Sequence, residues 1–330
     1  MSATAAVQSA APSAMQSILQ AVGGEEWQQQ LLESIESISA PLAVKMLNHI
    51  SLGANTNEPF NLLEHGCGMG VVAPLINETV PRELMERSSV LCGDFSDLLV
   101  DVVRKRIKNE GWIQTRAEVV DSQNSGLPAR SFTHVVSNIM YHVVPDSQAA
   151  LKDSIGLLRP GGTLAFTTWH SQNSGWAADV RSAFDSLPAD FLPEDYSFHI
   201  PMQMTSYGHW DDVNWIKQVL ISEGLEDVKV DVLAHLSEVK GPRHFMKLYD
   251  VMVEVAAKLT LGLSTEGDNG RERVGEVKRL VEEHLEKKYG EEGSWYLTWW
   301  EEAILKARAY EKELGRWAKL SSHCMSPSAK

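Results

Sequence analysis

The feature that most limits the possible folds is a glycine-rich turn that directly follows a short apolar segment. Gly66, Gly68 and Gly70 come just after the apolar residues 60–64. Because glycine has no Cβ, a chain can turn there from a strand into a helix while its backbone approaches a ligand. The free N–H groups of the next helix, predicted over about residues 71–77, suit a carboxylate or a phosphate. By itself this turn leaves the ligand open.

After the turn, apolar segments and amphipathic segments alternate regularly. Strands are predicted at residues 90–92, 117–120, 132–138 and 163–169, with helices beginning near residue 97 and at residue 148. Such alternation is typical of parallel strands joined by right-handed crossovers. The sequence therefore predicts an α/β fold with a Rossmann-like, doubly wound sheet.

The segments around this alternation predict one domain over residues 23–308, between a flexible N-terminus (1–22) and a C-terminal tail (309–330). Residues 25–52 have apolar positions at helical spacing, broken near 39–41, which predicts two helices and a lid. Residues 171–209 form a substrate-side insertion. A helix (210–224) and a strand (228–234) precede two amphipathic helices in a cap (241–290). Residues 295–307 favour a last strand over a helix.

Three acidic residues stand at predicted strand ends. Glu64, two residues before the first glycine, could meet the ammonium of an amino-acid ligand directly or through water, which a dinucleotide site does not need. Asp94 lies 24 residues beyond Gly70, where a carboxylate can accept both ribose hydroxyls, or else cap the next helix. Asp121 ends the third strand and could accept from an adenine amino group, or be an ordinary turn residue.

These residues resemble the class I S-adenosylmethionine (SAM)-dependent methyltransferases, in particular the ubiquinone/menaquinone-methyltransferase-like branch and its fungal small-molecule members. The resemblance covers most of residues 60–170 and rests on the motifs LEHGCGMG (63–70), GDFS (93–96), VD (120–121), SFTHVV (131–136) and LRPGG (158–162). It implies that the last two strands pair antiparallel. It also implies SAM contacts from Glu64, Gly66, Gly68, Asp94, Phe95 and Asp121, with Ser122 a further adenine contact and Asn138 facing the methionine part.

Methyl transfer from a sulfonium is an in-line displacement, so a general base is optional. His142 and His170, just beyond the fourth and fifth strands, are the candidate bases, although His142 could instead cap a helix or contact the cofactor. Tyr141 and Trp169 either line the acceptor pocket or pack in the core. The chain also lacks the prolines after Asn138 that are usual in methyltransferases acting on amide or exocyclic base nitrogens, which argues against nucleic-acid or protein-amide acceptors.

The composition limits the kinds of partner that this protein is expected to bind. The formal net charge is −14 and basic residues do not cluster beyond residues 104–108, an expected solvated helix face. This argues against nucleic acid or an anionic membrane as the main partner. With three cysteines and no ligand-spaced His or Cys motif, no metal is predicted. No signal peptide or membrane span is found, which predicts a cytoplasmic enzyme.

The sequence thus predicts methylation of a small organic acceptor, which we expect to be a specialised metabolite. S-adenosylhomocysteine (SAH) is the second product. Two alternatives stay open: a SAM-binding fold that transfers no methyl group, as a regulatory partner or a cyclase, and a nicotinamide dehydrogenase, which Glu64 and the glycine spacing disfavour. The sequence names neither the acceptor atom nor the oligomeric state.

Overall fold

The computed structural model describes residues 25–198, 200, 203–264 and 267–309, with the backbone alone at 25–31 and 300–307. The predicted flexible N-terminus (1–22) and nearly all of the predicted tail (309–330) lie outside these residues.

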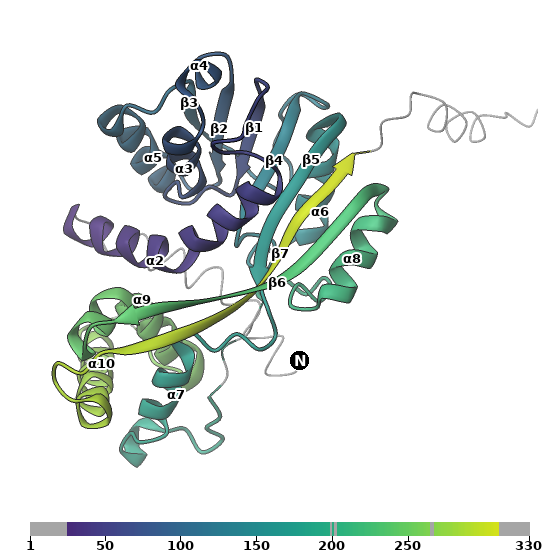
Figure 1. Cartoon of the computed structure of the whole chain (residues 1–330). Helices are drawn as coiled ribbons and strands as arrows, with labels where there is room; N and C mark the ends of the chain where they lie inside the picture. The colour runs from purple at the N-terminus through teal and green to yellow at the C-terminus, as the bar shows by residue number, and fades with distance from the viewer. Residues whose placement is uncertain (1–24, 199, 201–202, 265–266, 310–330) are drawn as a thin grey trace, which may run out of the picture.

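A seven-stranded sheet organises the chain, in the order β3-β2-β1-β4-β5-β7-β6 (Figure 1). The first five strands are parallel, and β7 runs antiparallel to both β5 and β6. The order reverses between β1 and β4, which in such sheets creates a crevice at the carboxyl ends of the strands. The predicted doubly wound sheet with an antiparallel last pair is confirmed. The strands are β1 (Asn61–His65), β2 (Ser89–Asp94), β3 (Thr115–Val119), β4 (Phe132–Asn138), β5 (Leu158–Trp169), β6 (Leu225–Val239) and β7 (Trp295–Ala309).

Helices cover both faces of the sheet because neighbouring strand residues point to opposite sides. Leu62 and Val136 pack with α3 and α5, whereas Leu63 and Val135 pack with α6 and α8. Local signals fix the ends of these helices: for example, the Ser96 hydroxyl accepts from the backbone N–H of Leu99 at the start of α5. The helices of this body are α3 (Val72–Thr79), the short α4 (Arg82–Met85), α5 (Asp97–Glu110), α6 (Ser147–Leu157) and α8 (Val213–Ser222).

The strands β6 and β7 continue beyond the sheet as a two-stranded ribbon, and helices gather at its far end (Figure 1). These are α7 (Ala177–Phe184), a 3-10 turn (Ala189–Phe191), α9 (Pro242–Leu261) and α10 (Gly267–Tyr289). They surround an apolar cluster that contains Phe184, Val253, Val277 and Trp295. We call this part of the molecule, formed by α7, α9, α10 and the ribbon, the cap; the two amphipathic helices and the last strand were predicted.

One helix, α2 (Glu25–His49), lies between the body and the cap (Figure 1). The predicted break near residues 39–41 is wrong, because the helix continues through Pro41. Proline removes one N–H donor, but Leu42 and Met46 beyond it are fully buried, and this burial holds the second half of the helix in place. Ile38 packs into the cap cluster, whereas Met46 packs into the body, so α2 joins the two.

Candidate active site

The three glycines of the turn all adopt positive φ, but for different structural reasons. A Cβ on Gly66 would lie 2.6 Å from the Met140 sulfur, and one on Gly70 would lie 3.3 Å from Trp112. A Cβ on Gly68 would have no atom within 4 Å. Gly66 and Gly70 therefore permit close packing, and Gly68 is the point where a ligand can approach the backbone.

Glu64 lies beneath this turn and caps α3. Its Oε1 accepts from the backbone N–H of Val72 (3.0 Å) and its Oε2 from that of Ala73 (3.1 Å). The N-cap residue, Val71, has no side-chain acceptor of its own. Burial raises the pKa of Glu64 to about 7, and the backbone N–H groups partly offset this. Since both oxygens serve the helix, the predicted contact with a ligand ammonium is not formed within the chain and stays a prediction.

Asp94 joins the glycine turn to the end of β2. Its Oδ2 accepts from the N–H of Gly68 (2.8 Å) and its Oδ1 from that of Ser96 (3.0 Å). Burial raises its pKa, while these N–H groups act in the opposite direction. The cap of α5 is Ser96 rather than Asp94. The neighbouring Phe95 is 57% exposed, so its ring offers an apolar surface beside a polar carboxylate.

The end of β3 lies next to Asp94, because the N–H of Val120 donates to the Asp94 carbonyl at 2.8 Å. The next residue, Asp121, is exposed, and its Oδ1 accepts from the backbone and side chain of Gln123 at 2.9 and 3.0 Å. Ser122 is buried. The structure thus brings the ends of β1, β2 and β3 together. One carboxylate oxygen of Asp121 is already used in the turn with Gln123.

Arg106, on α5, is a residue of this region that the sequence analysis missed. Its Nη1 donates to the carbonyls of Met69 (3.0 Å) and Gly70 (2.7 Å), and its Nη2 to Glu36 of α2 (3.1 Å). Its side chain is only 12% exposed, so the expectation of a solvated face was wrong at this position. The signal was available: Arg106 lies three and four residues after the apolar Val103 and Val102, and therefore on the buried side of the helix.

The end of β4 is held in an unusual backbone conformation. Ile139 has a φ of +57°, which is strongly disfavoured for a β-branched residue. Its N–H donates to the carbonyl and to the hydroxyl of Thr167 on β5, each at 3.1 Å. The preceding Asn138 accepts from the same hydroxyl (2.6 Å) and donates to the Ser39 carbonyl of α2 (3.2 Å). Strain that neighbours maintain in this way is common at functional sites.

The two predicted aromatic pocket residues have different surroundings. Tyr141 is fully buried, donates to the Ser154 hydroxyl at 2.8 Å and stacks on Trp210 at 5.0 Å between ring centroids. Its predicted place in the acceptor pocket is therefore corrected to a place in the core. Trp169 instead lies between the rings of His142 and Trp299, with centroids 5.8 Å from each.

The two candidate bases have different surroundings. His142 is 3% exposed, and burial lowers its pKa to about 3, so its imidazole is neutral at physiological pH. Among the described residues its Nδ1 has no hydrogen-bond partner. His170 is partly exposed; its Nδ1 accepts from the N–H of Gln172 at 3.1 Å, and it lines an open hollow of about 430 Å³ together with His209 and Asp211.

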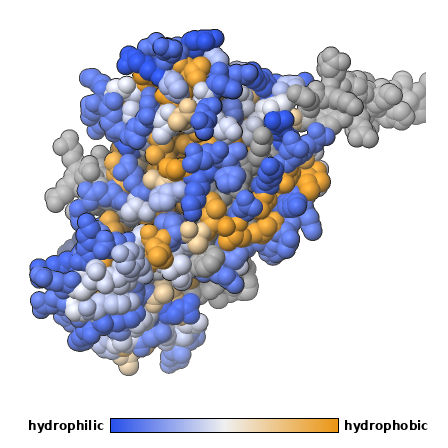
Figure 2. Space-filling model, viewed as in Figure 1, coloured by the Kyte–Doolittle hydropathy of each residue, from blue (hydrophilic) through white to orange (hydrophobic). Residues whose placement is uncertain are grey.

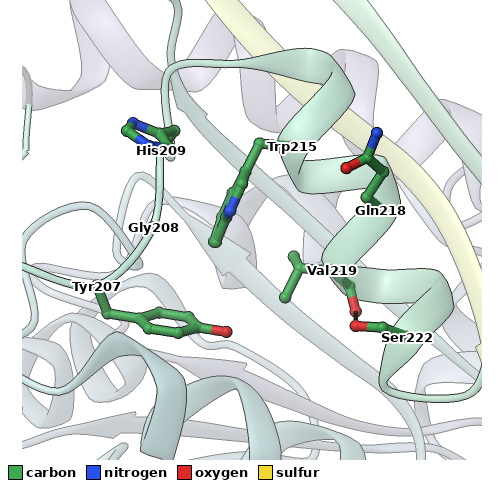
Figure 3. A pocket seen from close by; sticks show the side chains of 7 residues that line it. All are labelled: Tyr207, Gly208, His209, Trp215, Gln218, Val219 and Ser222. Atoms are coloured by element: carbon green, nitrogen blue, oxygen red, sulfur yellow. Dashed lines mark hydrogen bonds between the residues drawn. The ribbon is translucent and has the colours of Figure 1, made fainter.

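A larger hollow of about 520 Å³ lies over α8 and the loop before it (Figure 3). The rings of Tyr207 and Trp215 meet edge to face with 5.6 Å between their centroids, and Val219 and Ser222 line the α8 side of the hollow. None of the residues predicted to bind the cofactor lines this hollow.

In the part of the chain that the structure describes, no group of three or more His, Cys, Asp or Glu side chains is placed to hold a metal ion. No described helix combines the length and the apolar character that crossing a membrane requires.

The central part of the chain is similar to known proteins. Residues 63–166 match the family model described as "Methyltransferase domain", a span that runs from β1 to β5 and contains Glu64, Asp94, Phe95, Asp121 and Asn138.

Three of the similar proteins come from fungi of the genus Aspergillus. Methyltransferase tpcH of Aspergillus fumigatus is 30% identical over 151 residues, which cover 46% of this chain and 53% of that protein. Acetylaranotin bis-thiomethyltransferase of Aspergillus terreus is 26% identical over 257 residues, covering 77% and 85%. Methyltransferase ktnA of Aspergillus niger is 27% identical over 219 residues, covering 60% and 69%. The chain thus spans about half the length of the first relative and more of the other two.

Proposed function

We propose that this chain, whose residues 63–166 match the methyltransferase domain family, transfers the methyl group of SAM to a small organic acceptor. The observation that carries the proposal is the open backbone of Gly68 beside the Asp94 carboxylate and the exposed ring of Phe95. A carboxylate that accepts hydrogen bonds, a backbone without a side chain and an apolar ring at one edge of the sheet suit a nucleoside that carries an amino-acid chain. The net charge of −14 supports a small molecule rather than nucleic acid, and a cytoplasmic location stays part of the proposal.

Each predicted cofactor residue has a place in this proposal. The lone pairs of Asp94 that remain free would hold the ribose hydroxyls, and the Phe95 ring would cover the adenine. Asp121 and Ser122 would meet the adenine edge. The backbone at Gly66 and Gly68, with Asn138 across the crevice, would hold the methionine part, and Glu64 would act through water. When bound, SAM supplies an electrophilic methyl group on a sulfonium.

The chain itself would contribute orientation and exclusion of water. The helix α2 spans the carboxyl end of the sheet, where it accepts hydrogen bonds from the Asn138 amide and the Arg106 guanidinium. A closed site of this kind increases the rate by holding the acceptor in line with the methyl group. His142 is a neutral imidazole, so it would orient an acceptor through a hydrogen bond rather than take up a full charge. His170, nearer to solvent, stays the second candidate base.

Equilibrium binding of SAH tests the cofactor assignment. Asp94→Ala should weaken SAH binding about tenfold or more, because hydrogen bonds to a charged group contribute about 1.5–3 kcal/mol. Asp101→Ala removes an exposed carboxylate from the helix next to it and should leave the affinity unchanged. A folded Asp94→Ala variant that binds SAH like the wild type would contradict the proposal, as would binding of NADH but not of SAH.

A thiol acceptor is the second candidate, because the relative from A. terreus, named for thiomethyl transfer, matches 77% of this chain. Incubation of the protein with SAM labelled in its methyl group and a metabolite extract separates the possibilities. A labelled ether or ester supports an oxygen acceptor, and a labelled thioether supports sulfur. Tight binding of SAM without any labelled product would support a SAM-binding protein that transfers no methyl group.

A further inference from the structure

A line of aromatic rings runs from the carboxyl end of the sheet into the cap. It begins at His142, after β4, and continues through Trp169 of β5 to Trp299 of β7, with two steps of 5.8 Å between ring centroids. Beyond Trp299 it reaches His235 of β6 and Tyr249 of α9, each at 6.2 Å. We call these five residues the aromatic line. Five segments distant in sequence meet along it.

The aromatic line contains an unusual concentration of unpartnered polar atoms. Among the described residues, eight buried side-chain nitrogen or oxygen atoms have no hydrogen-bond partner, and four of them are His142 Nδ1, His235 Nδ1 and Nε2, and Tyr249 Oη. His142 and Tyr249 are 3% and 0% exposed. Such atoms are rare in folded proteins because each loses its hydrogen bonds to water. Their concentration in one place indicates that a bound ligand supplies the missing hydrogen bonds.

The polar groups of the aromatic line are uncharged at neutral pH. Burial lowers the pKa of His142 and of His235, and Lys45 lowers that of His235 further. The carbonyl of Ser37 on α2 acts on His235 in the opposite direction. Burial raises the pKa of Tyr249, and the neighbouring Ser37 and Ser237 hydroxyls partly offset this rise. In the described part of the chain, no carboxylate contributes to these shifts. A cationic acceptor would therefore lose its hydration without gaining a partner of opposite charge, and an anionic acceptor would have only the partly exposed Lys45 ammonium near His235.

We infer that the aromatic line is the acceptor site and that it takes an uncharged, flat conjugated ring system bearing a hydroxyl group. This inference rests on the proposed function. An aromatic ring face such as that of the partly exposed Trp169 favours flat conjugated molecules. A neutral imidazole and a phenol each offer one donor and one acceptor, which match hydroxyl and carbonyl groups. His142 lies four residues after Asn138 at the cofactor edge, so the hydroxyl that reaches its Nδ1 is the one that is methylated.

The reaction balances without a further reactant. A bond forms between the acceptor oxygen and the methyl carbon, the bond between that carbon and the sulfonium sulfur breaks, and the hydroxyl proton passes to water. The products are a methyl ether, SAH and one proton. Tyr249 and His235 act at the far end of the acceptor, where they determine which ring systems fit.

The probe for this inference is 1,3-dihydroxynaphthalene, offered to the full-length protein saturated with SAH and, separately, to the protein with SAM. We expect binding by calorimetry and release of SAH with formation of a methyl ether. The matched charged probe, 3-hydroxy-2-naphthoate, should bind at least tenfold more weakly, and dithiothreitol should not be methylated. Normal SAH binding without binding of the naphthol would overturn this inference alone, as would preferred methylation of the dithiol. Failure to bind SAH would overturn the proposed function.

The variant Tyr249→Phe separates a ligand-binding hydroxyl from a structural one. It should weaken naphthol binding about threefold to tenfold, the size expected for one neutral hydrogen bond, and leave SAH affinity unchanged. Because the hydroxyl it removes has no partner, the melting temperature without ligand should stay the same or rise. Tyr207→Phe, at the hollow over α8, is the control and should change neither affinity. A lower melting temperature with unchanged naphthol affinity would overturn the assignment.

Discussion

The glycine turn and the aromatic line differ in whether their buried polar groups have hydrogen-bond partners. Around the glycine turn, Glu64, Asp94 and Arg106 all make hydrogen bonds to backbone groups, so this region is already in its final geometry. Along the aromatic line, Tyr249 and His142 are equally buried but keep unpartnered atoms. Under the proposed function, the difference means that the cofactor side is preorganised by the chain, whereas the acceptor side is completed only by its ligand.

The cap has a well-connected polar centre of its own, although the Thr260 hydroxyl of α9 is also unpartnered among the described residues. Asp179 of α7 is buried in the cap and accepts from the Lys288 ammonium (2.8 Å), the Tyr289 hydroxyl (2.7 Å) and the Trp295 indole N–H (2.9 Å). One carboxylate thereby joins α7, α10 and β7. Figure 2 shows that charged and polar residues cover much of the outer surface of this part of the molecule.

The largest expected effect comes from Asp179→Ala. The variant leaves the Lys288 ammonium and two other donors without their common acceptor, which should lower the free energy of unfolding by about 3–5 kcal/mol. Urea denaturation followed by tryptophan fluorescence measures this loss. Asp190→Ala removes an exposed carboxylate of the same cap and should cost less than about 1 kcal/mol. Equal losses in the two variants would mean that Asp179 does not hold the cap together.

Glu64 should make stability depend on pH. Its folded pKa of about 7 exceeds the value of 4.5 for an unfolded chain, so the folded state binds more protons than the unfolded state between these values. Stability should therefore fall as the pH rises from 4.5 to 7, by up to about 3 kcal/mol, and change little from this cause above pH 7. Unfolding measured across this range tests the sign, and Glu64→Gln should remove the Glu64 contribution. An unchanged slope in the variant would show that another group is responsible.

Arg106 tests whether the cofactor side is preorganised. Arg106→Met keeps the apolar stem but removes the donors to the Met69 and Gly70 carbonyls and to Glu36, so SAH affinity should fall about tenfold, equivalent to about 1.4 kcal/mol. Arg104→Met, on the exposed side of the same helix, is the control. Titration calorimetry with SAH measures both. If the two variants bind SAH equally well, the glycine turn holds its shape without Arg106.

The sequence predicted the sheet and the strand ends that meet at the glycine turn well because these depend on local patterns. Alternating apolar segments, the positive-φ glycines and the acids at strand ends all follow from rules that act within a few residues. The break predicted in α2 failed for the same reason: Pro41 is a local signal against a helix, and the burial of Met46 that overrides it depends on distant parts of the chain.

The aromatic line was beyond the reach of the sequence, apart from His142 and Trp169. His235, Tyr249 and Trp299 carry no motif, and Trp299 faces His235 only because β6 and β7 pair in that register. Whether a buried hydroxyl has a partner is likewise a property of the folded chain: nothing in the sequence separates Tyr141, which has one, from Tyr249, which has none.

The smallest expected effect is also the sharpest form of the comparison, because it uses these two buried tyrosines as a matched pair. Tyr141→Phe removes a hydroxyl that donates to Ser154, so it should lower the free energy of unfolding by about 1 kcal/mol. Tyr249→Phe should not lower it. Both rings stay buried, so the same change in volume applies to both, and thermal unfolding without ligand compares them directly. Equal destabilisation would mean that Tyr249 has a partner within the chain, and the acceptor side would then be as complete as the cofactor side.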